Sequence, residues 1–155
     1  RTIEEFRNFF KPSIEKEICD LVGVTFGVFS MLSAQLKTNS ISYGVTCHTH
    51  NVTFGSIDEA IPCDATLIMT YKNQLAHVIL NIISNSRDAI IHRRRTGTLG
   101  VNEEGTISVD CYKEEETMKL SISDNGGGIP EKILDKIFEP YFTTKSEIEG
   151  TGIGL

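Results

Sequence analysis

The side chains best suited to chemistry lie in the second half of this chain, and the first group of them follows one periodic segment. Over residues 72–92, polar side chains recur at steps of three or four along an otherwise apolar surface: Gln74, His77, Asn81, Ser84, Asn85, Asp88 and His92. The spacing predicts an amphipathic helix with one polar stripe. Because buried amides need hydrogen-bonding partners, the stripe must either face water or line a polar cavity.

A glycine-rich turn, Asp124–Pro130, is the second group, and it directly follows a predicted strand. Three consecutive glycines permit a tight turn and a close approach of a ligand to the backbone. The carboxylate of Asp124 at the mouth of the turn could accept a hydrogen bond from an exocyclic amino group. The alternative is a plain turn before a helix that begins at Pro130.

Two further segments could bind an anion. Phe138–Lys145 predicts a loop held by the aromatic rings of Phe138 and Phe142, with Lys145 free to reach an anion. The alternative is a surface loop anchored by core aromatic residues. Gly150–Leu155 has glycine at alternate positions, which exposes backbone N–H groups and suits phosphate binding at a helix N-terminus. It differs from the nucleotide-binding motifs of P-loop and Rossmann proteins.

In this order, the four segments resemble the catalytic and ATP-binding domain of sensor histidine kinases, within the gyrase, Hsp90, histidine kinase and MutL superfamily. Asn81–Ala89 is similar to the N box of that family and Asp124–Pro130 to its first glycine box. Phe138–Lys145 is similar to its F box and Gly150–Leu155 to its second glycine box. The residues of the N and F boxes are most similar to those of kinases of the nitrogen-regulator type.

The resemblance implies ATP and Mg²⁺ as cofactors and assigns roles by matching position. Asn85 would ligate Mg²⁺ through its side-chain oxygen, and Asn81 would support the phosphates or the waters of the metal. Asp124 would accept from the adenine amino group, and Lys145 and Arg87 would meet phosphate charge. The catalytic residues implied are Asn81, Asn85 and Lys145. The residues implied to bind the nucleotide are Asn85, Arg87, Asp88, Asp124, Gly126, Gly128, Ile129, Phe138, Thr144, Lys145, Gly150, Thr151, Gly152, Ile153, Gly154 and Leu155.

The implied activity is that of a protein histidine kinase, which transfers the γ-phosphoryl group of ATP to a histidine nitrogen. The acceptor of this family lies in a His-Glu or His-Asp segment, and the histidines of this chain all lack that context: His48, His50, His77 and His92. We therefore expect the acceptor on a separate dimerisation domain and the chain alone to be inactive. The further partner implied is a response regulator, with a homodimeric parent protein and a monomeric chain.

The alternative function is an ATPase clamp, or a nucleotide-binding module, of the same superfamily. The discriminating position is Asn81, because the ATPases place there a glutamate that acts as general base for water. An amide cannot do that work, so Asn81 favours the kinase.

Composition and net charge limit the number of domains and the class of partner. The chain has 155 residues, 39% of them hydrophobic and 23% charged, which is typical of one globular domain. The net charge of −6 disfavours nucleic acid as a partner.

We expect a cytoplasmic domain, because no apolar run of 18 residues and no signal peptide is visible; whether the parent is membrane-anchored stays open. The cysteines lack Cys-x-x-Cys spacing, which predicts reduced, packed thiols rather than a zinc site, and His48 and His50 are expected to face solvent rather than to form a metal pair.

Hydrophobic periodicity predicts the elements that position these groups. We expect the end of a helix over 3–10, a long helix over 13–36 capped by Ser13, and a strand over 41–47. Val52, Phe54 and Ile57 indicate part of a further strand, and residues 107–122 a β-hairpin.

The predicted fold is a two-layer α/β sandwich (α+β), a mixed sheet with helices on one face. The resemblance identifies it with the Bergerat-type ATP-binding fold. It implies that residues 1–12 are the tail of a dimerisation helix and a linker, and that residues 13–155 are the ATP-binding domain, incomplete at its C-terminus.

Overall fold

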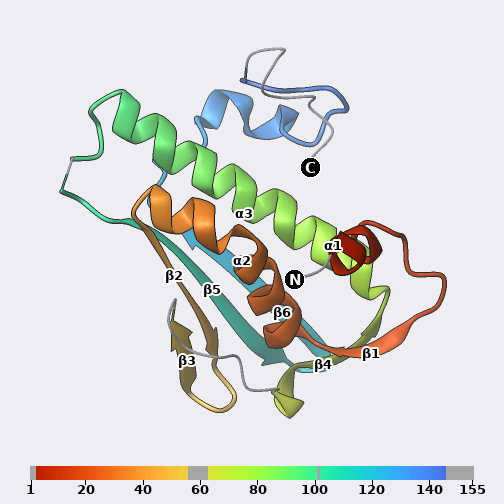
Figure 1. Ribbon diagram of the computed structural model, residues 1–155. Coiled ribbons are helices and arrows are strands. Elements are labelled where there is room, and N and C mark those ends of the chain that lie inside the picture. Colours follow the sequence, from red (N-terminus) through yellow and green to blue (C-terminus); the bar gives the residue numbers. More distant parts are fainter. Residues whose placement is uncertain (1–2, 56–62, 101, 146–155) are drawn as a thin grey trace.

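A mixed four-stranded sheet forms one layer of the molecule (Figure 1). The computed structural model describes residues 3–55, 63–100 and 102–145 of the chain. The sheet contains β2 (Ile41–Cys47), β3 (Val52–Gly55), β5 (Gly105–Glu114) and β6 (Thr117–Asp124), in the order β3-β2-β5-β6. Strands β2 and β5 are parallel, and the other neighbours are antiparallel. The predicted strand over 41–47 and the predicted hairpin are therefore confirmed.

Two long helices, α2 (Leu21–Thr38) and α3 (Lys72–Arg95), cover one face of this sheet (Figure 1). The core lies between the two layers. Its fully buried side chains include Phe29 of α2, Ile83 of α3 and Val109 of β5. The ring of Phe29 stacks on Tyr43 of β2 with centroids 4.2 Å apart and an interplanar angle of 4°. The predicted two-layer α/β sandwich is confirmed.

The predicted start of the second helix at Ser13 is wrong. Residues Glu17–Asp20 form strand β1, which pairs antiparallel with β4 (Leu67–Thr70), and α2 begins only at Leu21. Asp20 caps α2, since its Oδ1 accepts a hydrogen bond from the backbone N–H of Val22 at 3.0 Å. Pairing between strands about 50 residues apart in the sequence overrides the apolar helical spacing of this segment.

Ser13 does cap a helix, but the helix is α3. Its Oγ accepts a hydrogen bond from the backbone N–H of Asn73, the second residue of α3, at 3.1 Å. The preceding residue, Tyr71, makes no side-chain cap. The side chain of Gln74 also bonds the backbone N–H and carbonyl of Ser13, each at 3.1 Å. A residue 60 positions away therefore satisfies one of the free N–H groups at the start of α3.

The N-terminal helix α1 (Ile3–Phe9), as predicted, forms and is followed by a segment that lies against the first turns of α3. The side chain of Asn73 donates to the backbone carbonyls of Asn8 at 3.0 Å and Lys11 at 2.6 Å. The rings of Phe9 and Phe10 both contact the imidazole of His77, with centroid separations of 5.4 and 5.3 Å. This segment is thus attached to the helix that carries the polar stripe.

The shorter elements complete the chain. The 3₁₀ helix η1 (Asp64–Thr66) precedes β4, and the 3₁₀ helix η2 (Glu131–Lys136) follows Pro130. The predicted helix start at Pro130 is therefore a 3₁₀ helix. The expected strand around Val52 and Phe54 is β3, whereas Ile57 lies outside the described residues.

Helix α2 is long and apolar enough to cross a membrane, judged by length and composition alone. The expectation of no continuous apolar run of 18 residues is not contradicted, because polar residues such as Gln35 and Lys37 interrupt this helix. Half of α2 is buried, and it packs on β2 and α3 as the core helix of a folded domain does. The hydroxyl of Thr25, which is buried in α2, donates a hydrogen bond to the carbonyl of Leu21 at 2.8 Å. This buried polar group therefore has a partner within the helix and needs no water.

Candidate functional site

Helix α3 separates an apolar face from the polar stripe. Its buried side chains, Ala76, Ile79, Ile83, Ser86 and Ile90, recur at steps of three or four and face the core. Asn81 and Asn85 are exposed on the other side, and Asp88 is half-buried. The predicted helix is confirmed and extends three residues further, to Arg95. The segment that follows β6 lies along the C-terminal half of α3 (Figure 1), so part of the stripe faces a second chain segment rather than bulk water.

Lys145 meets the stripe from that second segment. Its Nζ donates to Oδ2 of Asp88 at 2.7 Å and to Oδ1 of Asn85 at 3.4 Å. The fold therefore brings together three of the predicted site residues, which the sequence separates by about 60 positions. A cation, an amide oxygen and a carboxylate at one point can bind a phosphate group and its divalent cation.

The carboxylate of Asp88 lies between two cations. Its Oδ1 accepts from Nε of Arg87 at 2.9 Å, and Nη2 of the same guanidinium lies 2.8 Å from this oxygen. Burial is the largest single influence and acts to raise the pKa of Asp88. The hydrogen bonds and charges of Lys145 and Arg87 together outweigh it and lower that pKa. Asp88 is thus a carboxylate at neutral pH and engages both cations that were expected to meet phosphate.

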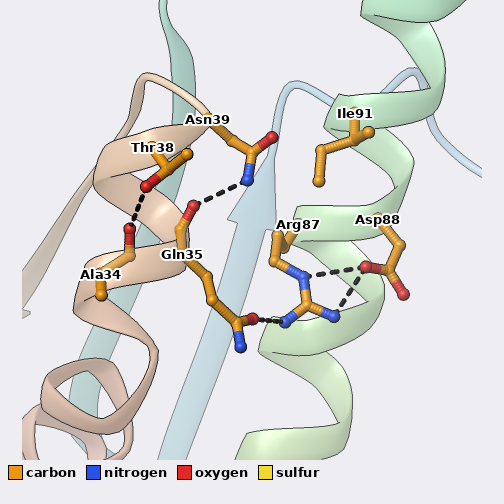
Figure 2. A pocket seen from close by; sticks show the side chains of 7 residues that line it. All are labelled: Ala34, Gln35, Thr38, Asn39, Arg87, Asp88 and Ile91. Atoms are coloured by element: carbon orange, nitrogen blue, oxygen red, sulfur yellow. Dashed lines mark hydrogen bonds and ion pairs between the residues drawn. The ribbon is translucent and has the colours of Figure 1, made fainter.

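Arg87 points toward α2 rather than along the stripe. Figure 2 shows its guanidinium between Asp88 and the side-chain oxygen of Gln35, to which Nη1 donates. This contact lies in a hollow of about 450 Å³ between α2 and α3, lined by Ala34, Gln35, Thr38, Asn39, Arg87, Asp88 and Ile91. The hollow shares only Arg87 and Asp88 with the predicted site, so it borders the polar stripe from the side of α2.

The glycine turn packs directly on α3. Asp124 ends β6, and its Oδ1 accepts from the backbone N–H of Gly126 at 2.8 Å. A Cβ on Gly126 would lie 2.6 Å from the Cβ of Ala89, one turn after Asn85, so only glycine permits this contact. Gly128 has φ +76°, a conformation that favours glycine. The predicted tight turn is confirmed, and the close backbone approach that it permits is made to α3.

The turn is also fixed by a side chain of α3. Nη1 of Arg93 donates to the carbonyl of Asn125 at 2.5 Å, and the same arginine bonds the carbonyl of Thr98. Asp124 therefore lies near the stripe, because the turn that follows it contacts α3 at Ala89 and Arg93.

The remaining predicted residues divide into two groups. Ile129, Phe138 and Thr144 are exposed, and Phe138 is 71% exposed. The prediction that Phe138 anchors its loop in the core is therefore wrong, because the segment that follows β6 lies on the outer side of α3 (Figure 1). Phe142 is half-buried. The second glycine box lies outside the described residues: Gly150, Thr151, Gly152, Ile153, Gly154 and Leu155.

The cysteines are free and buried, as predicted. His48 is half-exposed and bonded to Asp110 at 2.7 Å, also as predicted for a solvent-facing histidine. Sequence reasoning missed one cluster, in which Cys47, His50 and Cys63 lie within 4.8 Å of one another. Its spacings of three and thirteen residues match no familiar ligand motif, and only the fold brings these residues together.

Comparisons with known proteins agree with this architecture. Residues 70–155 match the family described as histidine kinase-, DNA gyrase B- and HSP90-like ATPase. The two-component sensor PprA of Pseudomonas aeruginosa is 39% identical over 94 residues, which cover 61% of this chain and 10% of that protein. The sensor histidine kinase ZraS of Escherichia coli is 40% identical over 88 residues, covering 57% of this chain and 16% of that protein. The chain thus spans only a small part of these relatives.

Solved structures show the same fold. The catalytic domain of the histidine kinase ThkA superposes with a TM-score of 0.65 at 17% identity, covering 90% of this chain and 74% of that one. The mycobacterial sensor histidine kinase MprB gives a TM-score of 0.61 at 18% identity, covering 90% of this chain and 72% of that one. Because the family match covers more than half of the residues, the chain belongs to the histidine kinase-, DNA gyrase B- and HSP90-like ATPases, as an ATP-binding domain of the sensor histidine kinase type.

Proposed function

We propose that this chain is the ATP-binding catalytic domain of a two-component sensor histidine kinase, and that it transfers the γ-phosphoryl group of ATP to a histidine on a dimerisation domain. One observation carries the proposal: Lys145 meets Asn85 and Asp88 on the stripe of α3. The names of the relatives, two of which are sensor kinases 39% and 40% identical to parts of this chain, support the same reaction.

Asn85 is the proposed protein ligand of Mg²⁺. The side chain of Asn85 is exposed, and its oxygen accepts a hydrogen bond from the ammonium group of Lys145. The lone pairs of this oxygen therefore already interact with a positive charge. Mg²⁺ prefers oxygen ligands and keeps several waters and phosphate oxygens around it, so a single amide suffices. When bound, the metal neutralises the charge that develops on the phosphate oxygens.

Lys145 is the proposed phosphate ligand, and Asp88 its positioning partner. Without nucleotide, Asp88 holds the ammonium of Lys145 against the stripe at 2.7 Å. Arg87 remains as a counter-ion of Asp88, so Lys145 can turn to a phosphate without leaving a buried charge unpaired. Catalysis by such a site depends on positioning and on charge stabilisation rather than on covalent chemistry.

Asp124 is the proposed adenine ligand, with Gly126 and Gly128 shaping the pocket around the base. One oxygen of Asp124 bonds the N–H of Gly126, and an ionised carboxylate can accept further hydrogen bonds, one of them from the adenine amino group. Asn81 lies one turn before Asn85 and is exposed. Because an amide cannot deprotonate water, it supports phosphotransfer and disfavours ATP hydrolysis.

The proposed partners are a dimerisation domain that carries the acceptor histidine and a response regulator. We propose that residues 1–12 are the tail of a dimerisation helix and a linker, which the helical conformation of Ile3–Phe9 supports. A structure of ThkA in complex with a response regulator shares this fold, with a TM-score of 0.59 at 18% identity. The parent protein is proposed to be a homodimer with this domain in the cytoplasm.

Calorimetric titration of the chain with ATP, with and without Mg²⁺, tests the binding site. Asn85→Ala should remove the Mg²⁺-dependent part of the affinity, whereas Asp124→Asn should weaken ATP and ADP alike. Each loss should amount to roughly 10- to 150-fold, from about 1.5–3 kcal/mol for a lost charge-assisted contact. Asn102→Ala, in an exposed loop, is the matched control and should bind normally. Unchanged affinity in Asp124→Asn would contradict the adenine assignment.

A labelling experiment tests the reaction. With γ-labelled ATP and Mg²⁺, the chain alone should neither label itself nor hydrolyse ATP quickly, because its histidines lack the acceptor context and Asn81 is not a base. A complete version of this domain, mixed with a separate dimerisation domain that carries the acceptor histidine, should produce an acid-labile, base-stable label. Rapid ATP turnover by the chain alone would favour the ATPase clamp, and a label on serine or threonine would refute histidine phosphotransfer.

A further inference from the structure

A cluster of two cysteines and one histidine lies at the Cys47 end of β2. The sulfurs of Cys47 and Cys63 are 3.1 Å apart, and Nδ1 of His50 lies 3.3 Å from Sγ of Cys63 and 3.9 Å from Sγ of Cys47. We propose that these three side chains form a zinc-binding site, which links the β2–β3 turn to the start of η1.

The orientation of the His50 ring is the first argument. Its Nδ1 faces the two sulfurs, and its Nε2 lies 3.4 Å from Oδ1 of Asp64. A proton on Nε2, directed at the carboxylate, leaves the lone pair of Nδ1 directed at the sulfurs. Zinc-bound histidines are oriented in this way, with the second nitrogen donating to a carboxylate.

The rigidity of the cysteines is the second argument. Cys47 is the last residue of β2 and pairs in register with Cys111 of β5. The backbone of Cys63 is held at both ends, since its N–H donates to Oδ2 of Asp20 at 2.9 Å and its carbonyl accepts from the N–H and the hydroxyl of Thr66, each at 3.2 Å. The ligands are therefore largely pre-positioned, which reduces the ordering that binding requires.

Ligand chemistry and spacing favour zinc. Thiolate and imidazole together select Zn²⁺ among the common cations. Around a tetrahedral zinc with bonds of about 2.3 Å to sulfur and 2.0–2.1 Å to nitrogen, sulfurs lie about 3.8 Å apart and sulfur and nitrogen about 3.5 Å apart. The observed separations of 3.1, 3.3 and 3.9 Å need only small side-chain shifts to reach these values.

Charge and access are also compatible with the site. The two sulfurs are buried, with Cys47 1% and Cys63 4% exposed, and two thiolates there would be costly without a cation. Zn²⁺ balances them and leaves the site neutral. The side chain of His50 is 47% exposed, so a metal can enter from solvent at the histidine. Three protein ligands leave the fourth position of the metal to a water.

The site lies away from the proposed nucleotide site. Cys47 and Cys111 pair at one end of the parallel strands, whereas the glycine turn leaves β6 beside the other end, where Asp124 pairs with Ile107. The proposed zinc would therefore act on the stability of this end of the sheet rather than on nucleotide binding. It would hold the sheet end against η1, which leads through β4 into α3.

Metal titration of the chain, purified under reducing conditions, tests the proposal. Co²⁺ should bind in a one-to-one ratio with a thiolate-to-cobalt charge-transfer band, and Zn²⁺ should displace it and raise the thermal unfolding temperature. Cys63→Ala and His50→Ala should abolish the band. Cys19→Ala, a buried cysteine of β1, and His48→Ala, the neighbouring histidine, are matched controls that should retain it.

A second variant keeps the test valid if a cysteine replacement unfolds the chain. Asp64 is 86% exposed, so Asp64→Asn should fold normally while it lowers zinc affinity by about 10- to 100-fold, the usual effect of losing the carboxylate that orients a metal-binding histidine. The absence of a one-to-one cobalt complex, or a band that persists in Cys63→Ala, would overturn the proposal. A mass two hydrogens lower, showing that Cys47 and Cys63 form a disulfide in place of binding metal, would also overturn it.

Discussion

Replacement of Gly126 by alanine tests whether the glycine turn is fixed by contact with α3. The added Cβ would lie 2.6 Å from the Cβ of Ala89, 2.8 Å from Oδ1 of Asp124 and 3.2 Å from the backbone carbon of Ala89. Carbon atoms in favourable contact are about 3.5–4.0 Å apart, so the turn must move by about 1 Å. Overpacking of this kind costs about 1–3 kcal/mol, and we expect Gly126→Ala to lower the free energy of unfolding by that amount.

A double-mutant cycle identifies the contact responsible. Ala89→Gly removes the nearest carbon but costs about 1 kcal/mol in the interior of α3. The double variant should be more stable than the sum of the two losses predicts, by roughly 0.5–2 kcal/mol. Rescue should be partial, because Asp124 and the backbone of α3 still oppose the new methyl group.

Equilibrium unfolding in urea, with unchanged m-values, gives each free energy. Gly27→Ala is the control, since the Cβ added there meets nothing within 4 Å and Gly27, like Gly126, has no positive φ. The nucleotide affinity of Gly126→Ala should also fall, because the turn positions Asp124. Strictly additive losses in the cycle, or a loss at Gly126 no larger than about 0.5 kcal/mol, would refute the steric argument.

Three further predictions concern the helices and the ion pair. Gly27→Ala should raise the free energy of unfolding by about 0.5–1 kcal/mol, measured in urea, because its added Cβ meets nothing within 4 Å in the interior of α2. Ser13→Ala should lower it by about 0.5–2 kcal/mol through the lost cap of α3, whereas Ser33→Ala should change it little. Lys145→Met should cost about 0.2–1 kcal/mol at pH 7, a solvent-screened value for a pair that is one-third exposed. Because the pKa of Asp88 is lowered in the fold, the contribution of this pair is present above the ordinary aspartate pKa and is lost as pH falls through the lowered value. In unfolding scans, the difference in stability between the variant and the wild type should therefore shrink as the pH is lowered through this range.

Local patterns were sufficient to predict most of the sheet and α3. The stripe from Gln74 to His92 repeats at the helical period, and residues 41–47 and 107–122 alternate as strands do. Each pattern arises from burial of one face of an element, so it is present in the sequence without knowledge of its partner. The same holds for the tight turn at Asp124–Pro130, because its three glycines and its position after a strand are local features.

Part of the site was also predictable, because Asn85 and Asp88 occupy one helix face and Lys145 ends a recognisable motif. The structure brings these three together, while their roles toward nucleotide stay predictions. Sequence reasoning placed Phe138 in the core, since a large aromatic side chain is usually buried. It is exposed because its segment lies outside the helix layer, a fact of topology that a single residue type does not reveal.

Local sequence was sufficient to indicate most of the helical residues, the alternating strands over 41–47 and 107–122, and the sharp turn at Asp124–Pro130, because each of these depends on neighbours a few positions away. The tertiary structure alone decided that residues 17–20 are a strand, that Ser13 caps α3, and that Cys47, His50 and Cys63 meet. The first two contacts join residues roughly 50 to 60 positions apart, and the cysteines meet 16 residues apart. Contacts between residues so far apart in the chain produce no periodic pattern in the sequence. Only the packing of the sheet against the helices reveals them.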